Sequence, residues 1–175
     1  MNAVSLIQFL VKDARGFHEE TMKDVTPEQA DWQPSGRAMP IAAQYAHVIA
    51  TQDMGLHGML KGMPPLAASS WSDKTGLSEM PPMGPGSPLD EWAARVQIDL
   101  PSLRQYAEAV YTATDEYLAS LSDDDLDRSL DLSAVGFGEQ TVAFVLNAGW
   151  IANPHLHCGE VSCLKGMQGA KGYPA

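Results

Sequence analysis

The sequence predicts an all-α fold, a four-helix bundle with a long crossover loop between helices two and three. Apolar residues recur every three or four positions in four long segments, which is the spacing of one helical face. Few segments alternate as strands do, and a stretch rich in proline and glycine separates the second segment from the third. The chain has 175 residues, 45% of them hydrophobic, so a single domain over residues 1–175 is expected.

The first two long helices are expected in the N-terminal third of the chain. Helical spacing of apolar residues covers residues 2–23. Thr26 followed by Pro27 has the chemistry of a helix N-cap and first turn, so a short helical turn is expected there. The second long helix is expected to begin after Pro40 and to cover residues 41–61.

The middle of the chain predicts the crossover loop and the third helix. Residues 62–88 contain six prolines, together with several glycines and serines, so regular structure is not expected there. A short helix is expected in residues 89–98. The third long helix is expected over residues 101–121, where a proline suits the first turn.

The last helix carries a proline in its interior. Ser122 and the three aspartates after it predict a capped acidic turn, and residues 131–139 contain two glycines and no helical pattern. The fourth long helix is expected over residues 140–165. Pro154 lacks an N–H and clashes with the carbonyl of Trp150, so the sequence predicts a kink near this point.

Charge and cysteine content limit the classes of partner. The chain has 22 acidic and 11 basic residues, and its net charge of -11 repels phosphate backbones and anionic membranes. No run of about 18 apolar residues predicts a membrane span, and the N-terminus lacks a signal-peptide pattern. Cys158 and Cys163 have poor geometry for a disulfide on one helix. We therefore expect a reduced cytoplasmic protein that binds neither nucleic acid nor membranes.

The segment from Asn153 to Glu160 gathers two histidines, a thiol and a carboxylate, which are metal-binding groups. On a regular helix His157 shares the inward face of Trp150. His155 points elsewhere unless the Pro154 kink turns it inward. If His157 is not a metal ligand, we interpret it as a core histidine satisfied by one hydrogen bond. If His155 is not a ligand, we interpret it as an exposed or capping residue.

Other polar residues have several interpretations. His47 lies off the main apolar stripe of the second predicted helix and faces another helix or solvent. Asp53 and His57 can pair on one helix face, which we interpret as a surface or loop-facing contact. His18 is expected at the surface. Cys158 is expected to be a small packed residue rather than a nucleophile.

The chain resembles the DinB/YfiT-like superfamily of metalloenzymes, which are four-helix bundles often found as dimers. The matching segments are residues 26–34, residues 40–47 and residues 153–161, and a tail at residues 164–174 resembles one subgroup. They span nearly the whole chain in the expected order.

The resemblance implies a divalent metal, zinc or nickel, held by one histidine on helix two and a His-x-x-x-His pair on helix four. His47 matches the helix-two ligand, and His157 matches the second member of the pair. The first member falls on Asn153, whose amide is a poor substitute for imidazole. Either His155 moves in through the kink as the third ligand, or the site is weak, or it is lost.

The resemblance also implies chemistry. The better characterised members of this family look like thiol-dependent transferases and isomerases, in which the metal activates a low-molecular-weight thiol, and hydrolase roles are suggested for relatives. Glu160 or Asp53 is expected to act as the catalytic base, or to accept a hydrogen bond from a metal-binding histidine and orient its ring. A small-molecule substrate or thiol and a homodimer are expected. The alternative is a catalytically inactive binding or dimerisation module with a degenerate metal site.

Overall fold

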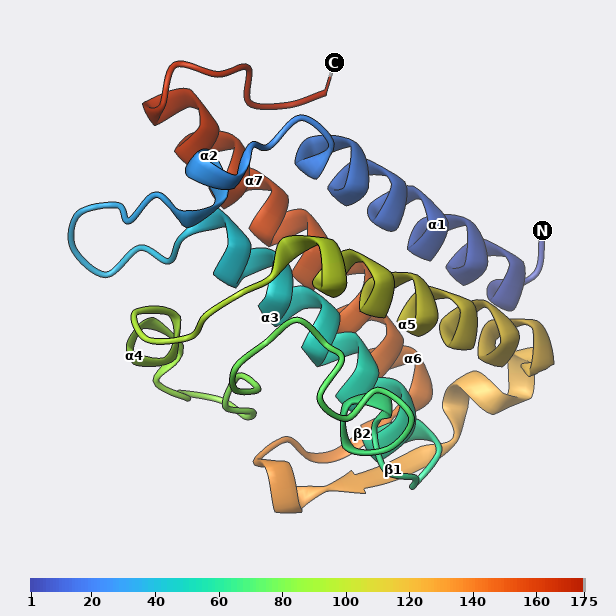
Figure 1. The fold of residues 1–175 in the computed structure, drawn as a ribbon. Helices are drawn as coiled ribbons and strands as arrows, with labels where there is room; N and C mark the ends of the chain where they lie inside the picture. The colour runs from blue at the N-terminus through green and yellow to red at the C-terminus, as the bar shows by residue number, and fades with distance from the viewer. Residues whose placement is uncertain (175) are drawn as a thin grey trace.

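The computed structural model describes residues 1–174, and it is mostly helical, with 62% helix (Figure 1). The all-α fold class is therefore confirmed. Within the described residues, none of the helices is both long and apolar enough to cross a membrane. The long helical segments are α1 (Ala3–Met22), α3 (Ile41–Asp53) continued by a π-helix (Met54–Leu60), α5 (Leu100–Ser120), and α6 (Val142–Leu146) continued by a π-helix (Asn147–Ala152) and α7 (Asn153–Met167).

The shorter elements connect these segments. They are α2 (Pro27–Asp31), α4 (Leu89–Ala93), the strands β1 (Ser129–Leu132) and β2 (Gly138–Thr141), and three 3₁₀ turns (Leu66–Ala68, Asp123–Asp127 and Ser133–Val135). The helix α4 ends five residues before the expected end of this helix at residue 98. The stretch between Leu60 and α4 has one 3₁₀ turn and otherwise runs without regular helix or strand.

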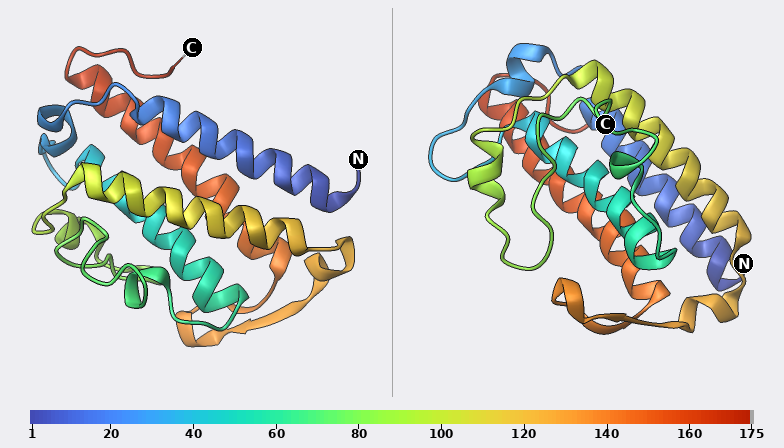
Figure 2. Two further views of the ribbon diagram at one scale, coloured as in Figure 1. Left: turned by 45° about the vertical axis from the view of Figure 1, so that its right-hand side comes forward. Right: turned by 60° about the horizontal axis from the view of Figure 1, so that its bottom comes forward.

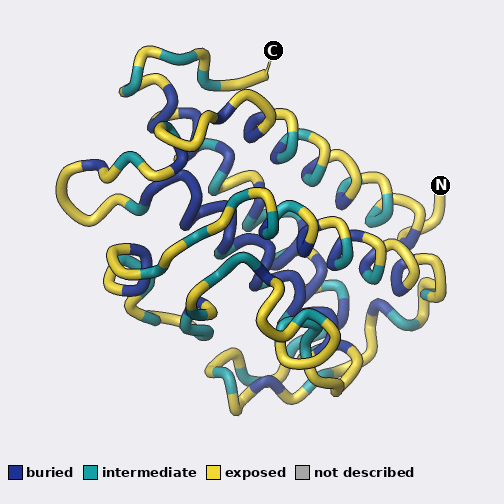
Figure 3. Tube along the Cα trace, viewed as in Figure 1, coloured by how far each residue is buried: buried dark blue, intermediate teal, exposed yellow. Residues whose placement is uncertain are grey.

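The long helices pack side by side through their apolar faces. Helix α1 lies against α5 and α7, and α3 lies against the same two helices (Figures 1 and 2). Buried residues face the middle of this arrangement and exposed residues face outward (Figure 3). Ile49 and Tyr106 belong to one apolar cluster, and Leu56 and Trp150 belong to another.

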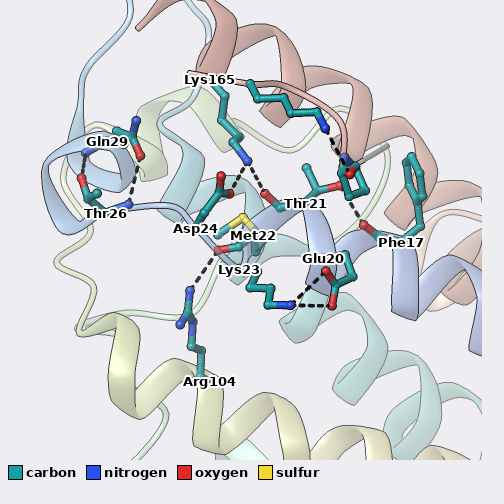
Figure 4. A network of polar contacts seen from close by, with 12 residues as sticks. Phe17, Glu20, Thr21, Met22, Lys23, Asp24, Thr26, Gln29, Arg104 and Lys165 are labelled. Carbon is teal, nitrogen blue, oxygen red and sulfur yellow. Dashed lines mark hydrogen bonds and ion pairs between the residues drawn. The ribbon is translucent and has the colours of Figure 1, made fainter. Parts of the chain in front are cut away.

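Two expected caps are present. Thr26 accepts a hydrogen bond from the backbone N–H of Gln29, and the Gln29 side chain accepts one from the N–H of Thr26 (Figure 4). Ser122 and Asp125 form the same kind of reciprocal cap at the acidic turn. Both local predictions are confirmed, because each depends only on residues within one turn.

The segment without a helical pattern forms a β-hairpin. Strands β1 and β2 pair antiparallel, with Leu132 opposite Gly138. The chain reverses through Gly136, at φ 85°, and Gly138, at φ 66°, which are left-handed conformations that favour glycine. The sequence did not predict these strands, because they have only four residues each and little alternation of polar and apolar side chains.

The C-terminal end of α1 is held by side chains from two other helices. Lys165 of α7 is buried and donates to the carbonyl of Thr21 at 2.9 Å and to Asp24 Oδ1 at 2.5 Å (Figure 4). Arg104 of α5 donates to the carbonyl of Met22 at 3.0 Å. These cations satisfy terminal carbonyls and complement the negative end of the helix dipole. They therefore fix α1 relative to α5 and α7.

Gly55 provides the close contact between the π-helix that follows α3 and Trp150. A Cβ atom at Gly55 would lie 2.9 Å from Cη2 of Trp150, and the indole N–H is held by Thr114 Oγ1 at 3.1 Å. We expect Gly55→Ala to lower the free energy of unfolding by about 1–3 kcal/mol through overpacking. Urea denaturation measures this change.

Gly16 is the matched control, because it is exposed in α1 and a Cβ there meets nothing within 4 Å. Gly16→Ala should raise stability by about 0.5–1 kcal/mol through helix propensity. Equal shifts in the two variants would contradict the assigned contact between residue 55 and Trp150.

Candidate functional site

His47 and His157 lie together where α3 packs against α7. Their ring centres are 5.0 Å apart and the rings meet edge to face at 71°. Both residues are half-buried. The structure thus brings together the two histidines that the family resemblance singled out, of which helical spacing had already pointed His157 inward.

The fourth helical segment accommodates Pro154 through its π-helix. Residues 147–152 form π-type turns, and Pro154 occupies the first turn of α7, where its missing N–H is tolerated. This irregularity does not turn His155 inward. His155 is exposed, and its ring lies 6.1 Å from that of Phe17 on α1. A third ligand at His155 would have to lie beside His47 and His157. The structure does not place His155 beside them.

His157 is oriented by two acceptors. Its Nδ1 lies 2.7 Å from Glu160 Oε2 and 2.9 Å from Gln44 Oε1. Both partners accept, so the Nδ1–H donates and Nε2 is the ring nitrogen left for another partner. The hydrogen bond from His157 lowers the pKa of Glu160, which keeps the carboxylate ionised. Glu160 therefore positions the ring, one helical turn away.

His47 is neutral and has an unpaired ring nitrogen. Burial lowers the pKa of His47 to about 4, and the neighbouring His157 acts in the same direction. The negative charge of Glu160 opposes these effects without overcoming them. The Nδ1 atom of His47 is buried and has no hydrogen-bond partner within residues 1–174. A neutral imidazole with a free nitrogen is the form that binds metals or accepts protons.

His18 is buried, so the prediction of a surface histidine was wrong. It is 1% exposed, and its ring lies 5.3 Å from Tyr45. Burial lowers the pKa of His18 to about 4, with smaller contributions from His157 and His155. The sequence held a signal, since His18 continues the buried run of Val11 and Ala14 at spacings of three and four.

Asp53 and His57 pair in the interior rather than at the surface. Asp53 Oδ1 lies 2.7 Å from His57 Nδ1, and its side chain is fully buried. The two carboxylate oxygens also accept from the N–H groups of Leu66 and Ala67, at 2.9 Å each, and from the Tyr106 hydroxyl at 2.6 Å. Because its oxygens are occupied, Asp53 anchors the loop. This replaces its expected role as a base or a partner of a metal-binding histidine.

An apolar cavity of about 470 Å³ adjoins the histidine pair. His47, Thr51 and Asn153 contribute its polar groups, and most of the remaining wall is aliphatic or aromatic. Thr51 and Gln44 lie four residues after and three before His47, so helical spacing already placed them beside it, although the sequence assigned them no role. Neighbouring Cys158 is packed as expected, and burial raises the pKa of its thiol to about 11.

The side chains fit a metal in part. Two imidazoles on one tetrahedral zinc, at about 2.0–2.1 Å each, place their ring centres about 5 Å apart, and a carboxylate on the second ring nitrogen is a common metal-site arrangement. His47, His157 and Glu160 have these features. However, across residues 1–174 no group of three or more His, Cys, Asp and Glu side chains could together hold a metal ion. The family resemblance places a third histidine ligand at the position that Asn153 occupies in this chain.

Comparisons with known proteins agree with this fold. The chain resembles the crystal structure of a conserved protein from Enterococcus faecalis, with a TM-score of 0.74 and 20% identity over 94% of this chain and 96% of that one. A comparison with curated proteins found no match. The family model of the DinB superfamily matches residues 12–160, which include both His47 and His157. The chain therefore belongs to the DinB superfamily.

Proposed function

We propose that this DinB-superfamily protein binds a divalent metal, zinc or nickel, through His47 and His157 and acts on a small molecule held in the adjoining cavity. The observation that carries the proposal is the placement of the two rings 5.0 Å apart, with Glu160 on Nδ1 of His157. The oriented ring leaves Nε2 free, and burial keeps His47 neutral.

Two protein ligands leave the remaining coordination positions to water, a small thiol or the Asn153 amide. A metal at this point would act as a Lewis acid and lower the pKa of a bound thiol or water, which is the chemistry of a thiol transferase or a hydrolase. The Glu160 carboxylate accepts a hydrogen bond from Nδ1–H of His157 and thereby fixes the ring of His157. The apolar wall excludes water from the reacting group.

A binding module without catalysis is the second candidate. It is favoured by the amide of Asn153 in place of an imidazole and by the hydrogen bonds that already occupy Nδ1 of His157. In this case Gln44 and Glu160 satisfy a core histidine and the cavity alone carries function.

Three further features extend this proposal. The four long helical segments would constitute a four-helix bundle with residues 62–88 as its crossover. A homodimer and a low-molecular-weight thiol as cofactor follow from the family resemblance, whereas a cytoplasmic location is expected from two cysteines with poor geometry for a disulfide. Light scattering tests the dimer.

Metal analysis of untagged protein after dialysis against zinc or nickel tests the metal proposal. We expect about one metal per chain in the wild type and at least a tenfold loss of affinity in His47→Ala and His157→Ala. Glu160→Gln should lose about 10–100-fold, because it removes the partner that orients His157.

His155→Ala is the matched control, since this histidine is exposed on the same helix and lies outside the pair. It should bind metal as the wild type does. The proposal fails if the folded wild type binds no metal, or if binding survives both His47→Ala and His157→Ala.

A further inference from the structure

The cavity beside His47 has no charged wall. It lies between the α3 segment, the segment with α6 and α7, the loop around Pro82 and the hairpin, and no Asp, Glu, Lys or Arg side chain lines it. Its volume of about 470 Å³ lies within the range of about 300–1,000 Å³ typical of small-molecule sites. In the metal-free protein an anion placed there would lose its hydration and meet no cation, so burial of the charge would be costly.

Thr51 lines this cavity and carries a hydroxyl without a hydrogen-bond partner. Two other helical threonines donate their hydroxyls to the carbonyl four residues earlier: Thr21 to Phe17 at 2.7 Å and Thr112 to Glu108 at 2.9 Å. Oγ1 of Thr51 is buried and makes no such bond, or any other, within the described residues. A buried hydroxyl without a partner costs free energy, so a partner from a ligand would be favoured.

His47 Nδ1 is the second unpaired polar atom on this helix, one turn from Thr51. Both residues line the cavity, whereas the rest of its surface is dominated by hydrocarbon and aromatic groups. The arrangement is that of a site with an apolar body and one polar end.

We infer that the cavity binds a neutral, mainly hydrocarbon molecule with a single hydrogen-bonding group, such as a hydroxyl, carbonyl or thiol, which pairs with Thr51. The inference deepens the proposed function, because it rests on the cavity being the substrate side of the His47–His157 site. It excludes carboxylates and other anions as the preferred ligands.

Displacement of the neutral dye N-phenylnaphthylamine tests this assignment on the full-length protein, as purified and again after chelation. The competitors are naphthylmethanol, methylnaphthalene and naphthoate, which share one ring system and differ in polar group and charge. After chelation we expect naphthylmethanol to bind about 5–10-fold more tightly than methylnaphthalene, the effect of one hydrogen bond, and naphthoate to bind most weakly.

Variants connect this preference to Thr51. Thr51→Val should abolish the advantage of the alcohol over the hydrocarbon, and Thr51→Ser should restore it. Thr112→Val, which removes an exposed helical hydroxyl on α5, should leave it unchanged. Ala148→Phe should weaken all three competitors, because Ala148 lines the cavity.

The inference is overturned if naphthoate binds as tightly as naphthylmethanol, or if the alcohol keeps its advantage in Thr51→Val. It is also overturned if Ala148→Phe leaves dye binding unchanged, or if the folded wild type binds neither dye nor alcohol. Metal analysis of the same samples keeps the two proposals apart. If Thr51→Val abolishes the advantage of the alcohol but the protein contains no metal, only the metal proposal is wrong. If the protein binds metal but Thr51→Val keeps that advantage, only the ligand assignment is wrong.

Discussion

Replacement of Asp53 by alanine is expected to lower the free energy of unfolding by about 3–5 kcal/mol, the cost of breaking a buried charged network. Its carboxylate is fully buried and receives hydrogen bonds from Leu66, Ala67 and Tyr106, beside His57. Alanine leaves these donors without their acceptor, and the hydrogen bond from the Tyr106 hydroxyl is a buried one. Urea denaturation gives the loss, and limited proteolysis within residues 62–88 should accelerate.

Asp115→Ala is the control for this change. Asp115 pairs with Arg15 at 3.0 Å on the surface, and its side chain is 56% exposed. Exposed pairs of this kind contribute about 0–1 kcal/mol. If Asp53→Ala were no more destabilising than Asp115→Ala, the role of Asp53 as the anchor of the crossover loop would be wrong.

Acidification is expected to remove about 3 kcal/mol of stability through His18 alone. Burial lowers the pKa of His18 from 6.5 to about 4 in the folded protein. As the pH falls, His18 is therefore protonated in the unfolded chain before it is protonated in the folded protein. The contribution is fully present above pH 6.5 and is lost as the pH falls from 6.5 towards 4. His47, with its pKa also lowered to about 4, should add to the same loss.

The comparison of wild type with His18→Phe isolates this effect. Phenylalanine preserves an aromatic contact with Tyr45 and does not titrate, and Nε2 of His18 has no hydrogen-bond partner to lose. Denaturation midpoints between about pH 7 and about pH 4.5 should fall less steeply in the variant. Parallel profiles for the two proteins would show that His18 is not held neutral by burial.

The long helices were predictable because their signals are local. Residues 2–23 and 101–121 carry the apolar spacing of one face, and the observed helices α1 and α5 agree with these limits to within one residue at each end. The cap at Thr26 is equally local. The π-helices were not predicted, because they arise where Gly55 packs on Trp150 and where Pro154 must be accommodated, both of which depend on neighbouring helices or chain context.

The candidate site was predictable only in part. Helical spacing pointed His157 inward, but the meeting of His47 with His157 depends on how α3 packs against α7, which sequence spacing alone does not determine. The burial of Asp53 depends on the loop that folds back over it. In both cases the missing information is a contact between residues far apart in the chain.

The central claim is that His47 and His157 are the protein ligands of one metal. Anomalous diffraction from zinc-soaked crystals of untagged protein tests it most directly. The account predicts one strong peak about 2.0–2.2 Å from a ring nitrogen of each of these two histidines. A peak bound to His155 or Cys163 without His47 and His157, or no peak between the two rings at saturating zinc, would contradict it.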